Sequence, residues 1–276
     1  MEENIVLLAG DARARALLHL LQAKGKTAAH LSACRSVEAL KAEITNAGTL
    51  VLPVPLSRDG VHLSGSGEAC ILLSDVLCAL QKGQRVFGGG FSDAHRAAME
   101  AAGATAVDFL KDESFVLKNA AFTAQGALRL LLEHTSEPLQ NLPVLVTGFG
   151  KVGKATSALL KSVGCRVTVA ARNEAQRTEA RLSGCEAVTL SSLSAQTAAV
   201  FNTVPARIFS AQALSQFAEG TLFLELASAP FGAEEKEVRA LGLHHIPAAA
   251  LPGKFVAAGC AKAMLALLET DAATGR

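Results

Sequence analysis

The stretch LVTGFGKVGKATSALLKSVGCRVTVAARN, from Leu145 to Asn173, decides the fold of the second half of the chain. An apolar run leads into the pattern G-x-G-x-x-G, which is followed by a helical pattern and a second apolar run. The first glycine permits a tight turn, the second lets a pyrophosphate approach the backbone, and the third lets helix and strand pack closely. Because the pattern follows a strand and begins a helix, it predicts a dinucleotide-binding unit. We expect the cofactor contacts of this turn at Gly148, Phe149, Gly150, Lys151, Val152 and Gly153.

The end of the second apolar run indicates which dinucleotide binds. In many such units this strand ends on an acidic residue that binds the ribose 2′-hydroxyl of NAD. Here the strand pattern ends on Ala171, Arg172 and Asn173, and the first carboxylate is Glu174. A guanidinium pairs with a 2′-phosphate, which a carboxylate would repel. We therefore favour NADP over NAD. The alternative is that Arg172 stacks on the adenine or lies in solvent, and that both cofactors bind.

Strand and helix patterns alternate along most of the chain. Apolar runs such as 4–10 and 49–55 alternate with helical patterns in the first 110 residues, and the alternation restarts at Pro143. Residues 112–136 read as one long helix or a helix pair. This order predicts parallel sheets covered by helices on both faces. We expect an α/β fold with two doubly wound domains, divided into a substrate-side domain at 1–112, a connecting helix and linker at 113–141, a dinucleotide-binding domain at 142–252, and a C-terminal helix at 253–276 that packs on the first domain.

Composition narrows the class of protein. Half of the 276 residues are hydrophobic and 18% are charged, so a sizeable core is available and disorder is not expected. The net charge is +1 and basic residues are scattered, which argues against nucleic-acid binding. The first residues lack the features of a signal peptide, and no apolar run is long enough to span a membrane, so we expect a cytoplasmic protein. Six widely spaced cysteines predict reduced thiols and no metal site: Cys34, Cys70, Cys78, Cys165, Cys185 and Cys260.

Further motifs lie in order along the chain: GDAR at 10–13, LPVPLSRDGV at 52–61, FNTVP at 201–205, LELASAPFG at 224–232 and LPGKF at 251–255. Their order and spacing resemble the family of dipicolinate synthase A subunits. The resemblance implies an N-terminal flavodoxin-like domain and a Rossmann domain that binds NADP. It also implies oxidation of a dihydrodipicolinate-type heterocycle to pyridine-2,6-dicarboxylate, a spore component, and the partner that it implies is a flavoprotein-like B subunit. Folds of this kind commonly form homo-oligomers, which we also expect here.

The chain departs from the pattern of this family at two places. The family often has Thr-x-Glu-Gly in the connecting helix, where this chain has T-A-Q-G, so an amide stands in place of a carboxylate at Gln125. After LPGK the family often continues A-P-K-T-A-G, and here Ala258 stands in place of the lysine. These departures keep two other functions open: a related dehydrogenase of small keto, hydroxy or amino acids, and an NADP-binding protein without catalysis.

Candidate substrate and catalytic residues follow from the chemistry of a dicarboxylate. Such a substrate needs cationic partners at the carboxyl ends of strands, and Arg13, Arg58 and Lys254 are the candidates, each weighed against an ordinary solvated charge. For proton removal we consider Asp11 and His95, because both follow predicted strands and histidine is the usual base near neutral pH. The alternative for His95 is a structural place in the first turn of a helix. The resemblance adds Thr123 to the catalytic candidates.

Two further loops are candidates for ligand contacts. Thr203, Val204 and Pro205 follow a predicted strand in FNTVP, and we expect them to contact the nicotinamide half of the cofactor. Gly88–Gly90 either cradle the substrate with backbone N–H groups or form a flexible turn.

Overall fold

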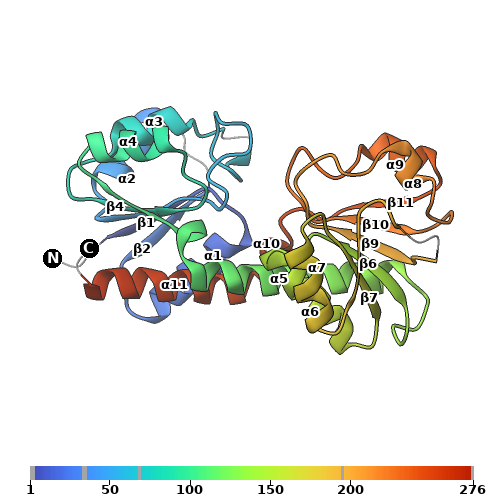
Figure 1. Cartoon of the computed structure of the whole chain (residues 1–276). Coiled ribbons are helices and arrows are strands. Elements are labelled where there is room, and N and C mark those ends of the chain that lie inside the picture. The colour runs from blue at the N-terminus through green and yellow to red at the C-terminus, as the bar shows by residue number, and fades with distance from the viewer. Residues whose placement is uncertain (1–3, 33–35, 68–69, 194–195, 275–276) are drawn as a thin grey trace. The chain divides into compact units, whose positions relative to one another are not determined.

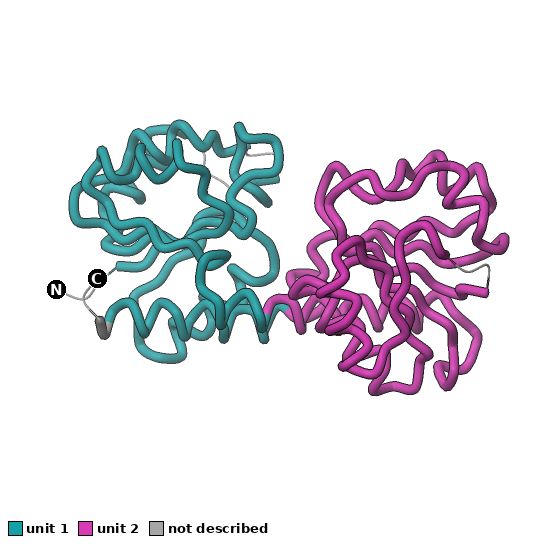
Figure 2. Tube along the Cα trace, in the orientation of Figure 1, with its two compact units in different colours: residues 1–118, 257–276 teal, residues 119–256 magenta. Residues whose placement is uncertain are grey.

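The computed structural model describes residues 4–32, 36–67, 70–193 and 196–274. The chain forms two compact units, shown in different colours in Figure 2. The first unit contains residues 1–118 and 257–276, and the second contains residues 119–256. Each unit is built around its own parallel sheet.

The first unit holds a five-stranded sheet in the order β2-β1-β3-β4-β5, with every pairing parallel (Figure 1). This is the flavodoxin-like order, so the expected fold of this domain is confirmed. Its elements up to the last strand are β1 (Ile5–Leu8), α1 (Ala12–Ala23), β2 (Ala28–Leu31), α2 (Val37–Thr45), β3 (Thr49–Val51), α3 (Leu73–Ala79), β4 (Arg85–Gly88), α4 (Asp93–Ala101) and β5 (Thr105–Asp108).

Helices cover both faces of this first sheet (Figure 1). On one face, Ile44 of α2, Val76 of α3 and Met99 of α4 are fully buried in a cluster with Val6 and Val86 of the strands. On the other face, α1 packs along α11 (Ala257–Thr274), the last helix of the chain. Successive side chains of each strand point to opposite faces of the sheet, so every strand contributes to the packing on both faces.

The second unit holds a six-stranded parallel sheet in the order β11-β10-β9-β6-β7-β8. Numbered within the unit, this is the doubly wound order 6-5-4-1-2-3 of a Rossmann fold, as the sequence predicts. Its elements are β6 (Pro143–Thr147), α6 (Lys151–Ser162), β7 (Arg166–Ala170), α7 (Glu174–Leu182), β8 (Glu186–Val188), β9 (Ala199–Asn202), α8 (Ala211–Leu214), β10 (Leu222–Glu225), α9 (Glu235–Ala240), β11 (His244–Pro247) and α10 (Leu251–Phe255).

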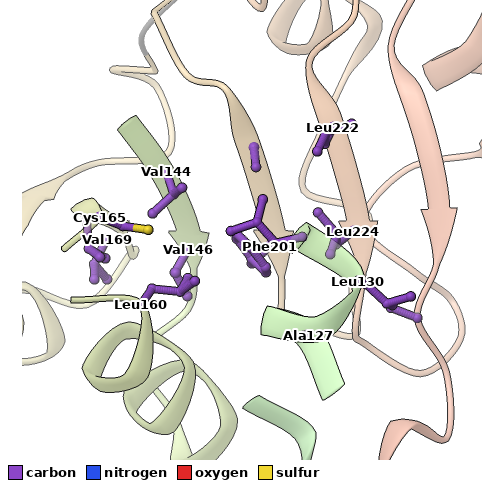
Figure 3. Close-up of a cluster of buried hydrophobic side chains, with 14 of the residues drawn as sticks. Ala127, Leu130, Val144, Val146, Leu160, Cys165, Val169, Phe201, Leu222 and Leu224 are labelled. Carbon is purple, nitrogen blue, oxygen red and sulfur yellow. The ribbon is translucent and has the colours of Figure 1, made fainter. Parts of the chain in front are cut away.

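The core of the second unit lies between this sheet and the helices beside it. Figure 3 shows Val146 of β6 and Phe201 of β9 beside Leu160 of α6 and Ala127 of the long helix α5 (Glu113–His134). All four side chains are at most 1% exposed. A close-packed core of this kind fixes the strand ends, and the strand ends carry the loops that form the site.

The helix α5 is one continuous helix, which settles the choice between one helix and a pair. The division between the units falls inside it, at Lys118, and the second division falls at Val256. The polar linker that marks the boundary in the sequence lies beyond this helix. The helix contributes to both cores: the ring of Phe115 lies 5.2 Å from that of Phe109 in the first unit, and Ala127 belongs to the core of the second unit. The strand β2 and the helix α2 have no counterpart among the expected elements.

Candidate dinucleotide site

The turn between β6 and α6 has the backbone that the glycine pattern predicts. Gly148 has a φ of +80°, a conformation that other residues rarely adopt. A Cβ atom at Gly153 would overlap the carbonyl oxygen of Gly148, so a glycine is needed for the helix to pack against the turn. Gly150 is the N-cap of α6, no side chain caps it, and a Cβ there would meet nothing within 4 Å. The N-terminus of α6 is therefore open to a ligand.

A cavity of about 570 Å³ lies over this turn at the carboxyl edge of the second sheet. Its lining comes from the loops after β6, β7, β8 and β9. The structure brings together every predicted cofactor residue there: Gly148, Phe149, Gly150, Lys151, Val152, Gly153, Ala171, Arg172, Asn173, Thr203, Val204 and Pro205. Ala170, Gln176 and Leu190 also line the cavity and were not predicted. Leu190 follows the short strand β8, so its place after a strand is the signal that could have found it.

The loop after β7 is held in place by a residue that sequence reasoning missed. The guanidinium of Arg177 donates to the carbonyl oxygens of Ala171 at 2.6 Å and Arg172 at 2.7 Å. Its Nε also donates to the carboxylate of Glu174 at 2.9 Å. The side chain of Asn173 accepts from the N–H of Ala175 and so caps α7. These bonds fix the backbone around Arg172, whose exposed side chain has no ion pair or hydrogen bond in the described part of the chain.

The first carboxylate after β7 is directed away from the cavity. Glu174 is not part of the cavity lining, and its oxygens pair with Arg181 at 2.9 Å and with Arg177. The hydrogen bonds from Arg181 and Arg177 lower the pKa of Glu174, so it is a carboxylate with its charge already balanced on α7. The only charged side chains among the lining residues are therefore the cations Lys151 and Arg172.

The loop after β9 is positioned by a buried polar network. Asn202 is fully buried, and its amide oxygen accepts from the hydroxyl of Thr147 at 2.6 Å and from the N–H of Val204 at 3.2 Å. Its amide nitrogen donates to the carbonyl of Val204 at 3.1 Å and to the carboxyl of Glu225 at 2.6 Å. The hydroxyl of Thr203 donates to the carbonyl of Thr147 at 2.6 Å. The loop that faces the cavity is thus tied to β6 and β10.

Glu225 ends this network at the carboxyl end of β10. It accepts from the N–H groups of Gly232 at 2.8 Å and Ala227 at 3.2 Å in addition to Asn202. Burial raises the pKa of Glu225, and these three hydrogen bonds oppose that rise. A sequence alone gives one signal for such a network: polar residues that end otherwise apolar strands.

The predicted candidates Asp11 and Arg13 lie together in the first unit. Asp11 is the N-cap of α1, and its carboxylate accepts from the Nε of Arg13 at 2.9 Å and from its Nη2 at 2.8 Å. The same Nη2 donates to the carbonyl of Val54. Burial raises the pKa of Asp11, but the hydrogen bonds and the charge of Arg13 outweigh burial, and the pKa lies below its ordinary value. Both residues line a second cavity, which Arg58 also lines.

Two further candidates of the first unit make structural hydrogen bonds. His95 belongs to the capping box of α4: its Nδ1 accepts from the N–H of Ser92 at 3.2 Å, so the structure gives it the structural place that was the alternative. The Gly88–Gly90 loop does not offer a free cradle, because the N–H of Gly90 donates to Asp108 and that of Gly89 to the carbonyl of Pro53. The carboxylate of Asp108 therefore occupies the place that an anionic ligand would take.

The remaining candidates belong to the second unit and line neither cavity. Thr123 is buried in α5, and its hydroxyl donates to the carbonyl of Asn119 at 2.8 Å. Lys254 is exposed on α10. The two departures from the family pattern, Gln125 and Ala258, are exposed as well. The catalytic roles of Thr123 and Lys254 stay predictions.

Both units match models of known protein families. Residues 4–110 match the N-terminal domain of the A subunit of dipicolinate synthase. Residues 118–252 match the NAD-binding domain of D-isomer specific 2-hydroxyacid dehydrogenases. The dipicolinate synthase A subunit of Bacillus subtilis is 28% identical over 150 residues, which are 53% of this chain and 50% of that protein, so the match spans half of the length of this relative.

Solved structures show the same fold over nearly the whole chain. Dipicolinate synthase A chain from Bacillus subtilis has a TM-score of 0.80 at 21% identity, covering 99% of this chain and 97% of that one. The dipicolinate synthase A subunit from Bacillus halodurans has a TM-score of 0.79 at 19% identity, covering 98% and 97%. A D-lactate dehydrogenase from Escherichia coli has a TM-score of 0.63 at 13% identity, covering 99% and 98%.

The fold, the cavity and the match of residues 118–252 give the second unit the architecture of the cofactor domain of NAD(P)-dependent oxidoreductases. The first unit matches the N-terminal domain of dipicolinate synthase A subunits, so the resemblance to that family that the ordered motifs predict is confirmed. Within the described residues, no helix is long and apolar enough to cross a membrane. Cys70, Cys78, Cys165, Cys185 and Cys260 are free thiols, and Cys34 lies outside the described residues. The cytoplasmic location and the homo-oligomer stay predictions.

Proposed function

We propose that this chain is the A subunit of a dipicolinate synthase that uses NADP to oxidise a dihydrodipicolinate-type heterocycle to pyridine-2,6-dicarboxylate, together with a flavoprotein-like B subunit. The reaction balances as the transfer of one hydride from a ring carbon to the nicotinamide with release of one proton, which makes the ring aromatic. The family match of the first unit supports the substrate, and the dehydrogenase-type second unit supports the reaction class. The observation that carries the choice of NADP is the loop after β7.

The residues around the large cavity fit a dinucleotide. Gly150 leaves open space where the pyrophosphate approaches, and the free N–H groups at the start of α6 are suited to bind an anion. Arg172 carries an unpaired guanidinium on a fixed backbone, and the amide nitrogen of Asn173 has no acceptor in the described part of the chain. Both groups can donate to a 2′-phosphate, and Glu174 is held on α7 by two arginines.

Nucleotide titrations test the choice of cofactor. We expect Arg172→Ala to weaken NADP binding by about tenfold or more with little effect on NAD, because a charge-assisted pair with the 2′-phosphate is lost. Arg172→Asp is expected to shift the preference toward NAD. Arg166→Ala is the matched control, since Arg166 is an exposed arginine at the opposite end of β7. Equal affinity of the unmodified chain for NADP and NAD would contradict the proposal.

The reaction is tested by mixing the full chain with the B subunit, NADP and the dihydrodipicolinate-type heterocycle. We expect one NADPH to form for each molecule of pyridine-2,6-dicarboxylate. The pyridine ring is followed by its ultraviolet absorbance. Tight NADP binding without any product, with and without the B subunit, would instead support a binding protein without catalysis.

A second candidate is a dehydrogenase of a small keto, hydroxy or amino acid. The match of residues 118–252 to the 2-hydroxyacid dehydrogenase domain favours it. Turnover of 2-keto acids with NADPH or NADH, in the absence of any B subunit, would establish this candidate in place of the first.

A further inference from the structure

A second cavity, of about 200 Å³, lies in the first unit and shares no lining residue with the dinucleotide cavity. It is lined by residues that follow β1, by residues that follow β3, and by the loop 58–65. The strands β1 and β3 are neighbours in the sheet, whereas β2 lies on the other side of β1. The cavity therefore sits at the point where the strand order reverses, which is where open α/β sheets bind their ligands.

Two arginines supply the charge of this cavity. The side chain of Arg13 is 10% exposed, and its Nε and Nη2 are fixed by Asp11 and Val54. Its Nη1 has no acceptor in the described part of the chain. The guanidinium of Arg58, an exposed residue on the rim, has no hydrogen bond or ion pair with any described residue. Since Arg13 balances the charge of Asp11, the lining carries one net positive charge.

Further donors in the lining also lack partners. The backbone N–H groups of Val54 and Gly65 have no acceptor among the described residues. The hydroxyl oxygen of Ser64 is shielded from solvent and has no hydrogen-bond partner. Buried polar groups are normally hydrogen-bonded, so the unpaired hydroxyl of Ser64 beside this cavity indicates a partner that the chain itself does not provide.

The walls of the cavity are held firmly. The N–H of Gly10 donates to the carbonyl of Ser64 at 3.0 Å, and the N–H of Ser64 donates to the carbonyl of Leu56 at 2.9 Å. Gly65 has a φ of +79°, and a Cβ atom there would overlap the carbonyl of Gly10. The loop 58–65 is thus closed against the turn after β1, and the donors are arranged before any ligand arrives. A site arranged in advance loses less entropy on binding.

We propose that this cavity binds a carboxylate group of the substrate, with Arg58 and the Nη1 of Arg13 as its cationic partners and Ser64 as a neutral donor. A guanidinium has the planar fork that matches the two oxygens of a carboxylate. The identity of the substrate as a heterocyclic dicarboxylate rests on the proposed function. The binding of a carboxylate by these residues rests on the cavity alone.

Calorimetric titration of the full chain with pyridine-2,6-dicarboxylate tests the proposal without any turnover. We expect Arg58→Ala to weaken binding by about tenfold or more, and Arg58→Lys to recover part of the loss, because a hydrogen bond to a charged group is removed and then partly replaced. Ser64→Ala should weaken binding less. Arg15→Ala is the matched control, since Arg15 is an exposed arginine of α1 outside the cavity lining, and its affinity should equal that of the unmodified chain. NADP affinity should be unchanged in all of these variants.

The inference would be overturned by the absence of diacid binding to the unmodified chain, by equal diacid binding to Arg58→Ala, or by inorganic phosphate that binds as tightly as the diacid. The last result would make the cavity a general anion site. Because the readout is binding, the two proposals fail separately. Arg58-dependent binding without product formation contradicts only the proposed function, and product formation that is unchanged in Arg58→Ala contradicts only this inference.

Discussion

The turn after β1 and the turn after β6 begin alike. Each follows a buried strand beside the reversal of its sheet, each contains a glycine with positive φ, and each leads into a helix of 12 residues. The φ angles are +90° at Gly10 and +80° at Gly148. They differ at the helix N-cap: Asp11 caps α1 with its own carboxylate, whereas Gly150 leaves α6 without any side-chain cap.

Because of this difference in the N-cap, two similar turns are suited to different ligands. At α6 the free N–H groups and the helix dipole remain available to the pyrophosphate of a dinucleotide. At α1 the carboxylate of Asp11 already accepts from the first turn of the helix, so the helix end gives little help in binding an anion. In the first unit the cationic groups at the cavity are instead side chains, and Arg13 and Arg58 both line it.

The largest effect is expected at the third glycine of the β6 turn. In Gly153→Ala the new Cβ atom would overlap the carbonyl oxygen of Gly148, so the helix must move away from the strand. We expect a loss of about 3 kcal/mol or more of unfolding free energy, at the upper end for overpacked sites. Urea denaturation measures it. A stability equal to that of the unmodified chain would show that the turn does not depend on close helix packing.

The next effect is expected in the other turn, at Arg13. Arg13→Ala removes the bonds to Asp11 and Val54 and leaves a carboxylate without its partner. Because Asp11 is 38% exposed and can be hydrated, we expect a loss of about 2 kcal/mol, less than for a fully buried pair. Arg15→Ala, on the same helix, should change the unfolding free energy by under about 0.5 kcal/mol. Equal losses in both variants would mean that the pair contributes nothing.

The two turns also show what a sequence can predict. The glycine spacing at Gly148, Gly150 and Gly153 predicts a turn, a helix and a ligand, because each glycine answers a local steric need. The role of Asp11 as a cap and the network of Asn202 depend on partners 2 to 55 residues away, and no local pattern encodes the distant ones. The strand β2 was missed because AAHL is short and largely small-residue, and it forms only by pairing with β1.

A smaller effect distinguishes the ligand role of a glycine from its packing role. Gly150→Ala meets no atom within 4 Å, so the unfolding free energy should change by less than about 1 kcal/mol. If the pyrophosphate binds at this turn as we propose, the added methyl group enters its space, and NADP affinity should fall about tenfold, or about 1.4 kcal/mol. Fluorescence titration with NADPH measures the affinity. Unchanged affinity in a stable variant would place the pyrophosphate elsewhere.

The smallest effect concerns the pH dependence of the Asp11 cap. Because Arg13 holds the pKa of Asp11 below its ordinary value, the ionised group stabilises the folded chain above the pKa of an unfolded aspartate, and this stabilisation is lost as the pH falls through the lowered pKa. The exposed Arg15 acts in the same direction. The nearby thiol of Cys260, with its pKa raised by burial to about 11, stays neutral throughout this range.

Asp11→Asn tests this prediction, since asparagine keeps the N-cap and removes only the charge. Unfolding free energies measured in urea at pH 5 and at pH 3 should fall less in the variant than in the unmodified chain. The difference should be below about 1 kcal/mol, as for other partly exposed pairs, and smaller in high salt. The N-cap of α6 is a glycine without a titratable side chain, so Gly150→Ala should leave the same pH dependence unaltered. A parallel fall in both chains would mean that Asp11 acts as a cap alone and that its charge does not stabilise the turn.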